Sequence, residues 1–155
     1  MGQEIERKFL INEMPELLKY ECRHLEQGYL CTKPTVRVRK EDGSYYMTYK
    51  GPGTILKEEY NLPLTKEAYE KLIKKADGNI ISKTRYLIPI GKNSVGNELT
   101  VELDVFDAPF DNLCFAEVEF MTQEEADSFD KPKWLGEDVS LDIEYSNAYL
   151  SQKVL

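Results

Sequence analysis

Polar and apolar residues alternate along most of this chain with a period of two, which is typical of β-strands with one buried face. The clearest example is Glu98 to Phe106 (ELTVELDVF), where Leu99, Val101 and Leu103 lie on one side and acidic residues or threonine on the other. The pattern predicts eight strands, at residues 1–11, 25–32, 35–40, 45–50, 57–64, 80–90, 98–106 and 115–121. Such a chain is expected to fold mainly as antiparallel β-sheet.

Helix signals occur between and after these strands. Thr65 begins the strongest predicted helix, which carries an apolar residue at every fourth position up to Ala76 and has Gly78 where a C-terminal cap belongs. A second, short helix is predicted at Thr122, which forms a T-x-x-E capping box with Glu125. The tail is predicted to turn at glycine 136 and to end in a helix at residues 145–150.

The polar faces of the predicted strands are strongly charged. Their charged residues are Glu4, Glu6, Lys8, Arg37, Arg39, Lys50, Lys57, Glu59, Lys83, Arg85, Glu102, Asp104, Glu117 and Glu119. One interpretation is a sheet with one wet face and weak surface ion pairs. The other is a closed barrel with the charged face inward and the apolar face covered by helices. Buried charges would then have to be paired or bound to ions.

Composition narrows the classes of function. The chain has 155 residues, which suits a single domain over 1–155, and a formal net charge of -8. That charge argues against binding to nucleic acid or to anionic membranes, and no apolar run is long enough to span a bilayer. The three cysteines form no C-x-x-C pair and are expected to be buried or half-buried thiols, which fits a cytoplasmic protein without a signal peptide.

A cavity lined by both kinds of charge would suit one class of ligand. Carboxylates bind hard divalent cations such as Mg²⁺ through oxygen. Arginine and lysine bind phosphate oxygens. A barrel interior that holds both groups would therefore suit a metal complex of a polyphosphate.

The ordered set of charged pairs resembles the CYTH domain family, also called triphosphate tunnel metalloenzymes. The family hallmark, E-x-E-x-K, is present as Glu4, Glu6 and Lys8. The other matching patterns are R-x-R at Arg37 and Arg39, T-x-K at Thr48 and Lys50, K-x-R at Lys83 and Arg85, E-x-D at Glu102 and Asp104, and E-x-E at Glu117 and Glu119. The hallmark alone is a weak pattern, but the ordered set covers nearly the whole chain and favours the barrel.

The resemblance implies an α+β, mostly β fold: a closed eight-stranded antiparallel barrel, the triphosphate tunnel, with helices packed outside. It implies metal ligation by Glu4, Glu6, Glu102, Asp104, Glu117 and Glu119, with Mg²⁺ or Mn²⁺ as cofactor. It implies triphosphate binding by Lys8, Arg37, Arg39, Lys50, Lys83 and Arg85, and catalytic roles for Glu6, Lys8, Glu59 and Glu119. The family strand that matches Lys57 and Glu59 often carries a second acid, which here is Asn61.

The short bacterial family members that the chain resembles imply metal-dependent hydrolysis of inorganic triphosphate to pyrophosphate and phosphate. Two other activities on the same scaffold stay open, an adenylate cyclase and a thiamine or nucleoside triphosphatase. A polyphosphate-binding module without turnover is the alternative from another class, and the number of carboxylates argues against it. The partner is thus a small triphosphate, and the sequence leaves a monomer and a homodimer both open.

Overall fold

The computed structural model of this protein describes residues 3–155. The strands are β1 (Gln3–Ile11), β2 (Glu21–Thr32), β3 (Thr35–Glu41), β4 (Ser44–Lys50), β5 (Leu56–Pro63), β6 (Asp77–Lys92), β7 (Glu98–Phe106), β8 (Cys114–Glu119) and β9 (Leu135–Asp138). The helices are α1 (Lys66–Ile73), α2 (Gln123–Asp127) and α3 (Asn147–Gln152), and two 3-10 helices span Leu17–Lys19 and Ile143–Tyr145.

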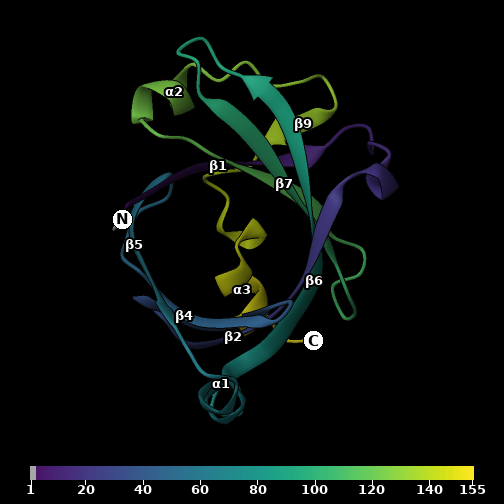
Figure 1. Cartoon of the computed structure of the whole chain (residues 1–155). Coiled ribbons are helices and arrows are strands. Elements are labelled where there is room, and N and C mark those ends of the chain that lie inside the picture. Colours follow the sequence, from purple (N-terminus) through teal and green to yellow (C-terminus); the bar gives the residue numbers. More distant parts are fainter. Residues whose placement is uncertain (1–2) are drawn as a thin grey trace.

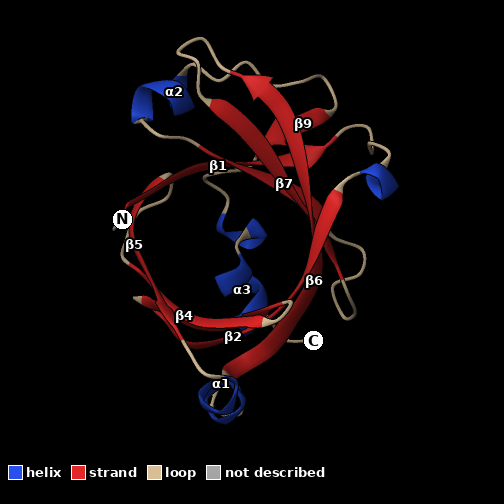
Figure 2. Ribbon diagram, in the orientation of Figure 1, coloured by secondary structure: helices blue, strands red, loops and turns tan. Residues whose placement is uncertain are grey.

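The first eight strands form a closed antiparallel barrel (Figures 1 and 2). They follow one another in the order β5-β4-β3-β2-β6-β7-β8-β1, and β1 pairs with β5 to close the ring. This closure is possible because β1 changes partners along its length: residues 3–5 pair with β5, and residues 6–9 pair with β8. The predicted closed eight-stranded barrel is therefore confirmed.

All eight predicted strands are present, and the hairpin between β3 and β4 turns at Asp42 and Gly43 as predicted. Residues 1 and 2 of the first predicted strand lie outside the described residues. The predicted turn at Gly136 is wrong, because this residue lies within β9, which pairs with β1. The predicted glycine cap is also wrong: α1 ends at Ile73, and Gly78 belongs to β6. There its positive φ of 83° leaves room for the backbone oxygen of Ser151.

The outward faces of β1, β7 and β8 carry the larger apolar core. Phe9, Leu103 and Val118 are fully buried there. Ala126 of α2 and Leu135 of β9 belong to the same cluster, so the chain after β8 covers this side of the barrel. The alternating apolar residues of these strands thus face away from the barrel interior.

Helix α1 covers the outer side of β2, β3 and β4. Its N-cap is Thr65, as predicted, and its buried Tyr69 donates a hydrogen bond to Glu26 at 2.7 Å. Gly28 of β2 allows the chain after the helix to approach the sheet, because a Cβ at this position would lie 2.7 Å from the Cβ of Ala76.

The barrel interior holds a second, smaller apolar cluster. Tyr29, Ile81, Phe106, Phe115 and Leu150 are its principal buried members. The last of these belongs to α3, which lies within the outline of the ring in Figure 1. Helices α1 and α2 pack outside the barrel as expected, whereas α3 closes part of its interior because it contributes an apolar side chain to the inward-facing aromatic residues.

Two other features bear on the sequence-based expectations. No helix within residues 3–155 is long and apolar enough to cross a membrane. Cys114 is half-buried as expected, but Cys22 and Cys31 are exposed, because they lie near the two ends of β2.

Candidate active site

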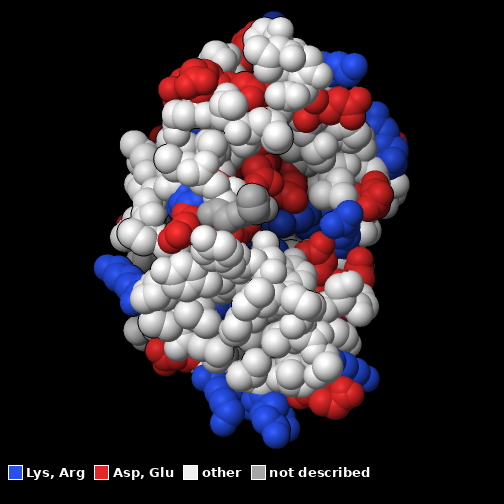
Figure 3. All heavy atoms as spheres, turned by 60° about the vertical axis from the view of Figure 1, so that its left-hand side comes forward, with Lys and Arg blue, Asp and Glu red and all other residues white. Residues whose placement is uncertain are grey.

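The barrel encloses a cavity of about 400 Å³ with a charged wall. Seven glutamates and six lysines or arginines are among its twenty lining residues. A hollow near the middle of the face in Figure 3 contains acidic and basic side chains together. The charged strand faces therefore line a shared interior, which excludes the interpretation of an open sheet with one wet face.

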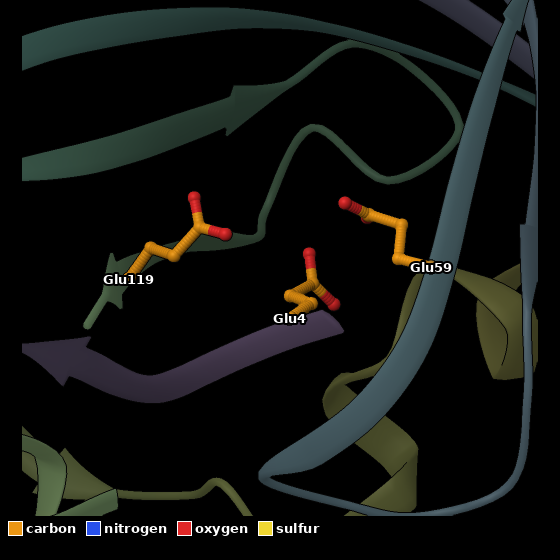
Figure 4. Close-up of side chains that lie close together, drawn as sticks. All are labelled: Glu4, Glu59 and Glu119. Atoms are coloured by element: carbon orange, nitrogen blue, oxygen red, sulfur yellow. The ribbon is translucent and has the colours of Figure 1, made fainter. Parts of the chain in front are cut away.

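Three carboxylates converge at one side of this cavity. Glu4 of β1, Glu59 of β5 and Glu119 of β8 each place an oxygen within 4.8 Å of the others, and the three side chains point toward one another (Figure 4). The closure of the barrel brings them together, because β1 lies between β5 and β8. Glu4 and Glu119 were predicted as metal ligands, and Glu59 was predicted as a catalytic residue.

Crowding and burial perturb these three acids in different ways. Burial, together with the neighbouring Glu4 and Glu59, raises the pKa of Glu119 to about 7. Burial and Glu4 likewise raise the pKa of Glu59. Burial raises the pKa of Glu4 too, but the charge of Lys50 and hydrogen bonds with Glu59 and Lys50 together outweigh burial, so this pKa lies below its ordinary value. The Nζ atom of Lys50 lies 2.9 Å from Glu4 Oε1 and 3.6 Å from Glu59 Oε2.

This cluster fits a divalent cation. Its donors are all carboxylate oxygens, which Mg²⁺ and Mn²⁺ prefer. The ammonium group of Lys50 pairs with Glu4 and Glu59, whereas Glu119 has no cation within 4.0 Å among the described residues. A bound cation would offset the repulsion that raises the pKa values of Glu59 and Glu119.

Three other predicted acids line the cavity outside this cluster. Glu117 lies 3.3 Å from Arg85 and 3.8 Å from Lys8, and these cations outweigh burial and hold its pKa well below the usual range. Burial and the adjacent Glu117 raise the pKa of Glu6 well above its ordinary value. Burial also raises the pKa of Glu102, against the effect of Arg85. Ionised and protonation-prone carboxylates thus lie side by side on β1, β7 and β8.

The arginines of β3 present a different kind of charge. Arg37 and Arg39 are 5% and 6% exposed and both line the cavity. Arg37 donates a hydrogen bond to the hydroxyl of Thr48 at 3.2 Å. Arg39 donates from Nε to Gln27 at 2.7 Å and from Nη1 to the hydroxyl of Tyr46 at 3.4 Å. Neutral oxygens hold both guanidinium groups, so their positive charges face the cavity largely uncompensated.

Two of the predicted residues lie behind the cavity wall. The side chains of Lys83 and Asp104 are 0% and 1% exposed, and neither is among the described residues that line the cavity. Lys83 Nζ lies 2.7 Å from Asp104, which also pairs with Arg85 through two hydrogen bonds of 2.8 and 3.0 Å. This placement does not favour direct contact of Lys83 with a triphosphate, because its ammonium group is paired with Asp104. It does not favour metal ligation by Asp104 either, because this carboxylate is paired with both Lys83 and Arg85.

Lys8 lies where the charged and apolar parts of the interior meet. Its Nζ donates a hydrogen bond to the backbone oxygen of Tyr145 at 2.6 Å and lies 4.8 Å from the ring centroid of Phe115. Behind it, Lys83 donates to Asn147 at 3.0 Å. The chain around α3 therefore contributes directly to the cavity wall, through Ser146, Asn147 and Ala148.

The sequence analysis did not assign a role to several of these residues. Glu41 lines the cavity and accepts hydrogen bonds from Tyr46 at 2.5 Å and Arg23 at 2.9 Å. Glu41 lies two residues after Arg39, as Arg39 lies two residues after Arg37, so alternation could have predicted that it faces the cavity. Gln27 and the residues around α3 carry no such signal, because local alternation does not reveal which side chain meets a given arginine or where a terminal helix docks.

Comparisons with known proteins agree with this architecture. The CYTH domain family profile matches residues 2–146. An inorganic triphosphatase of Nitrosomonas europaea is 36% identical to this chain, over 97% of this chain and 98% of the relative. An inorganic triphosphatase of Acetivibrio thermocellus is 32% identical, over 97% and 94%. A solved crystal structure of an inorganic triphosphatase is 34% identical, covers 99% of this chain and 97% of that chain, and has a TM-score of 0.68.

A more distant solved structure, a protein of Pyrococcus horikoshii, shares the fold alone, with 23% identity and a TM-score of 0.56 over 80% of this chain and 82% of that chain. The family profile covers all eight barrel strands and the cavity that they enclose, apart from two lining residues of the tail. Motif order, barrel topology and similarity to relatives therefore lead to one assignment: this chain belongs to the CYTH domain family.

Proposed function

We propose that this chain hydrolyses inorganic triphosphate to pyrophosphate and phosphate, with Mg²⁺ or Mn²⁺ as cofactor. The observation that carries the proposal is the division of charge within one cavity. The carboxylate cluster of Glu4, Glu59 and Glu119 lies on one side, and two arginines held by neutral groups lie on another. The names of the two curated relatives support the same reaction.

The side chains of the cavity divide the work of binding. Arg37 and Arg39 hold phosphate oxygens through charge-assisted hydrogen bonds, and Lys8 and Lys50 add positive charge from β1 and β4. Such contacts align the phosphoanhydride and stabilise the charge that develops on the transferred group. Catalysis of this kind needs positioned charge more than covalent chemistry.

The carboxylates hold the cation and the attacking water. Glu4, Glu59 and Glu119 are the ligands that the geometry favours, with Glu6, Glu102 and Glu117 near them on the wall. When bound, the divalent cation neutralises phosphate oxygens and makes a coordinated water easier to deprotonate. Glu6 lines the same cavity, and in this proposal it orients the attacking water and accepts its proton.

Lys83 and Asp104 take a supporting role in this proposal. They form a buried network with Arg85, whose guanidinium reaches Glu102 at 3.5 Å and Glu117 at 3.3 Å. The network fixes the position of Arg85 at the cavity wall. Lys83 and Arg85 were both predicted to bind the triphosphate, and this proposal keeps that role for Arg85 alone.

Inorganic triphosphate is preferred over nucleoside triphosphates in this proposal. A purine needs an aromatic or apolar surface to stack on, and the aromatic residues of the cavity wall are Tyr29 and Tyr46. Tyr29 is 3% exposed, and the hydroxyl of Tyr46 is engaged by Glu41 and Arg39. The wall therefore holds few aromatic groups for a base to stack on, and a nucleoside would add bulk with few compensating contacts.

The decisive experiment compares substrates side by side. The purified protein is incubated with inorganic triphosphate, ATP or thiamine triphosphate and Mg²⁺ or Mn²⁺, and products and kcat/KM are measured. We expect the highest kcat/KM for inorganic triphosphate, with pyrophosphate and phosphate as products and none in excess EDTA. Higher kcat/KM for ATP, or formation of cyclic AMP, would replace this proposal with a nucleotidase or a cyclase, and binding without products would favour the binding module.

The setting of the reaction follows from composition. Three free thiols, two of them exposed, support a reducing compartment such as the cytoplasm. The net charge of -8 supports the absence of nucleic-acid partners. The choice between monomer and homodimer stays open, and light scattering on the purified protein would settle it.

A further inference from the structure

The cations of the cavity differ in what holds them in place. Arg85 pairs with three carboxylates, and Lys50 pairs with two. Arg37 has no carboxylate within 4.0 Å among the described residues, and for Arg39 the nearest such pairing is with Glu41 at 3.8 Å. The positive charges of these two buried guanidinium groups on β3 are therefore only weakly offset by carboxylates, although burying a charge without a close ionic partner is costly.

Gln27 holds Arg39 through a neutral oxygen. The two residues lie opposite each other in the pairing of β2 with β3, and Gln27 Oε1 accepts the Nε proton of Arg39 at 2.7 Å. Because an arginine has donors alone, the amide must present its oxygen to Arg39. Gln27 is 0% exposed, and its Nε2 has no hydrogen-bond partner among the described residues. An amide kept at that cost suggests a role beyond packing.

Thr48 and Asn61 hold Arg37 in an equivalent way. Arg37, Thr48 and Asn61 lie opposite one another on β3, β4 and β5. The Thr48 hydroxyl donates to Asn61 Oδ1 at 2.5 Å, which leaves its lone pairs for the Nη2 proton of Arg37 at 3.2 Å. Thr48 is 0% exposed, and the Nε of Arg37 has no partner among the described residues. The charge of the Arg37 guanidinium is therefore not offset by a carboxylate within 4.0 Å among the described residues, and its Nε proton is free to bind a phosphate oxygen.

We propose that Gln27, Thr48 and Asn61 are positioning residues that orient Arg39 and Arg37 without neutralising them, so that these arginines remain available to the phosphate chain. A carboxylate at position 27, where the amide oxygen contacts Arg39 directly, would hold the arginine more strongly but would compete with the substrate for it. The inference rests on the proposed function, and it explains why the cavity would bind the triphosphate anion. Burial and the nearby Arg37 and Arg85 lower the pKa of Arg39, which shows that the pairing with Glu41 at 3.8 Å does not offset these effects.

Two substitutions of Gln27 separate charge from orientation. Gln27→Glu keeps an acceptor for Arg39 and adds a negative charge, whereas Gln27→Leu removes the acceptor and adds no charge. We expect Gln27→Glu to weaken binding of tripolyphosphate roughly tenfold to a hundredfold, with an unchanged or higher melting temperature, because the new carboxylate neutralises Arg39. We expect a smaller loss, of about threefold to tenfold, for Gln27→Leu.

The measurement is the Kd for tripolyphosphate by calorimetry in EDTA, together with the melting temperature. Asn112→Asp is the matched control, since it adds the same charge at an exposed loop residue, and its Kd should stay within about twofold of wild type. Thr48→Val provides an independent test at Arg37, because it removes the hydroxyl that accepts the Nη2 proton, and we expect a loss of binding of about threefold to tenfold, as for Gln27→Leu. If Gln27 were merely structural, the leucine variant would lose more binding than the glutamate variant.

The outcomes distinguish this inference from the proposed function. Hydrolysis of tripolyphosphate by the wild type with Mg²⁺ tests the function. If hydrolysis occurs but Gln27→Glu and Thr48→Val bind as tightly as wild type, or wild type does not bind in EDTA, the inference alone is overturned. A wild type that neither binds nor hydrolyses tripolyphosphate would overturn both.

Discussion

The two parts of the barrel interior differ sharply, although the same strands build them. On β8, Glu117 lines the charged cavity and Phe115, two residues earlier, belongs to the apolar cluster beneath α3. On β7, Asp104 lies in a charged network and Phe106 in the apolar cluster. Each pair shares one face of its strand, so the interior changes from charged to apolar within about 7 Å along the strand.

This difference separates stability from function. The apolar part is packed and contributes to folding through burial. The charged part concentrates like charges, and its acids have raised pKa values where carboxylates crowd one another. A site of this kind is stabilised by its ligands and tolerates loss of single charges, whereas the packed part does not tolerate loss of volume.

The largest expected effect is on activity, at the carboxylate cluster. Glu119→Gln or Glu4→Gln should lower kcat/KM for inorganic triphosphate by a factor on the order of a thousand, because each removes a ligand charge at constant size. The melting temperature without ligands should stay the same or rise in Glu119→Gln, since burial and the neighbouring acids raise the pKa of Glu119, whereas it should fall in Glu4→Gln, which loses the ion pair with Lys50. Glu137→Gln, at an exposed site of β9, is the control and should keep wild-type kinetics. Full activity of both cluster variants would contradict the site.

The apolar part is tested by Leu150→Ala in α3. This residue is 2% exposed within the interior cluster, so the substitution should lower the free energy of unfolding by about 2–5 kcal/mol, as measured by denaturant titration. Val154→Ala, at a side chain that is 92% exposed, should cost less than about 0.5 kcal/mol. A stable Leu150→Ala protein would mean that α3 does not depend on this packing.

The cationic side of the cavity is tested through its arginine fork. Arg39→Ala should lower kcat/KM roughly a hundredfold, because a charge-assisted contact to the phosphate chain is lost. Arg39→Lys should recover part of this loss, since it restores the charge but not the planar donors or the bond to Gln27. Equal activity of the lysine variant and wild type would show that donor geometry at this position is unimportant.

The smallest expected effect is ligand stabilisation, which links the two parts. Mg²⁺ with tripolyphosphate should raise the melting temperature by several degrees when each ligand is present at about a hundred times its Kd. Turnover during this measurement is blocked by Glu119→Gln or by use of a non-hydrolysable analogue. The shift from Mg²⁺ alone should be smaller in Glu119→Gln than in wild type, and unchanged in Leu150→Ala. A melting temperature indifferent to both ligands would contradict a site enclosed by the folded barrel.

Sequence patterns were informative wherever local geometry decides the outcome. Alternation placed all eight strands, and it assigned Glu4, Arg37 and Glu117 to the same kind of face, because successive side chains of a strand must point to opposite sides. The ordered charged pairs also led to the CYTH family, which the family profile confirms. Fold, family and most of the charged wall could therefore be predicted from the sequence alone.

The tertiary structure decided which of these charges meet. Glu59 joins Glu4 and Glu119 because β1 closes the barrel between β5 and β8. Lys83 is buried outside the cavity lining because it pairs with Asp104, the residue of β7 that lies opposite Arg85. Gln27 carries no charge and gave no pattern. Alternation specifies the face on which a side chain lies but not its neighbours around the ring, and these depend on strand order, register and the docking of α3.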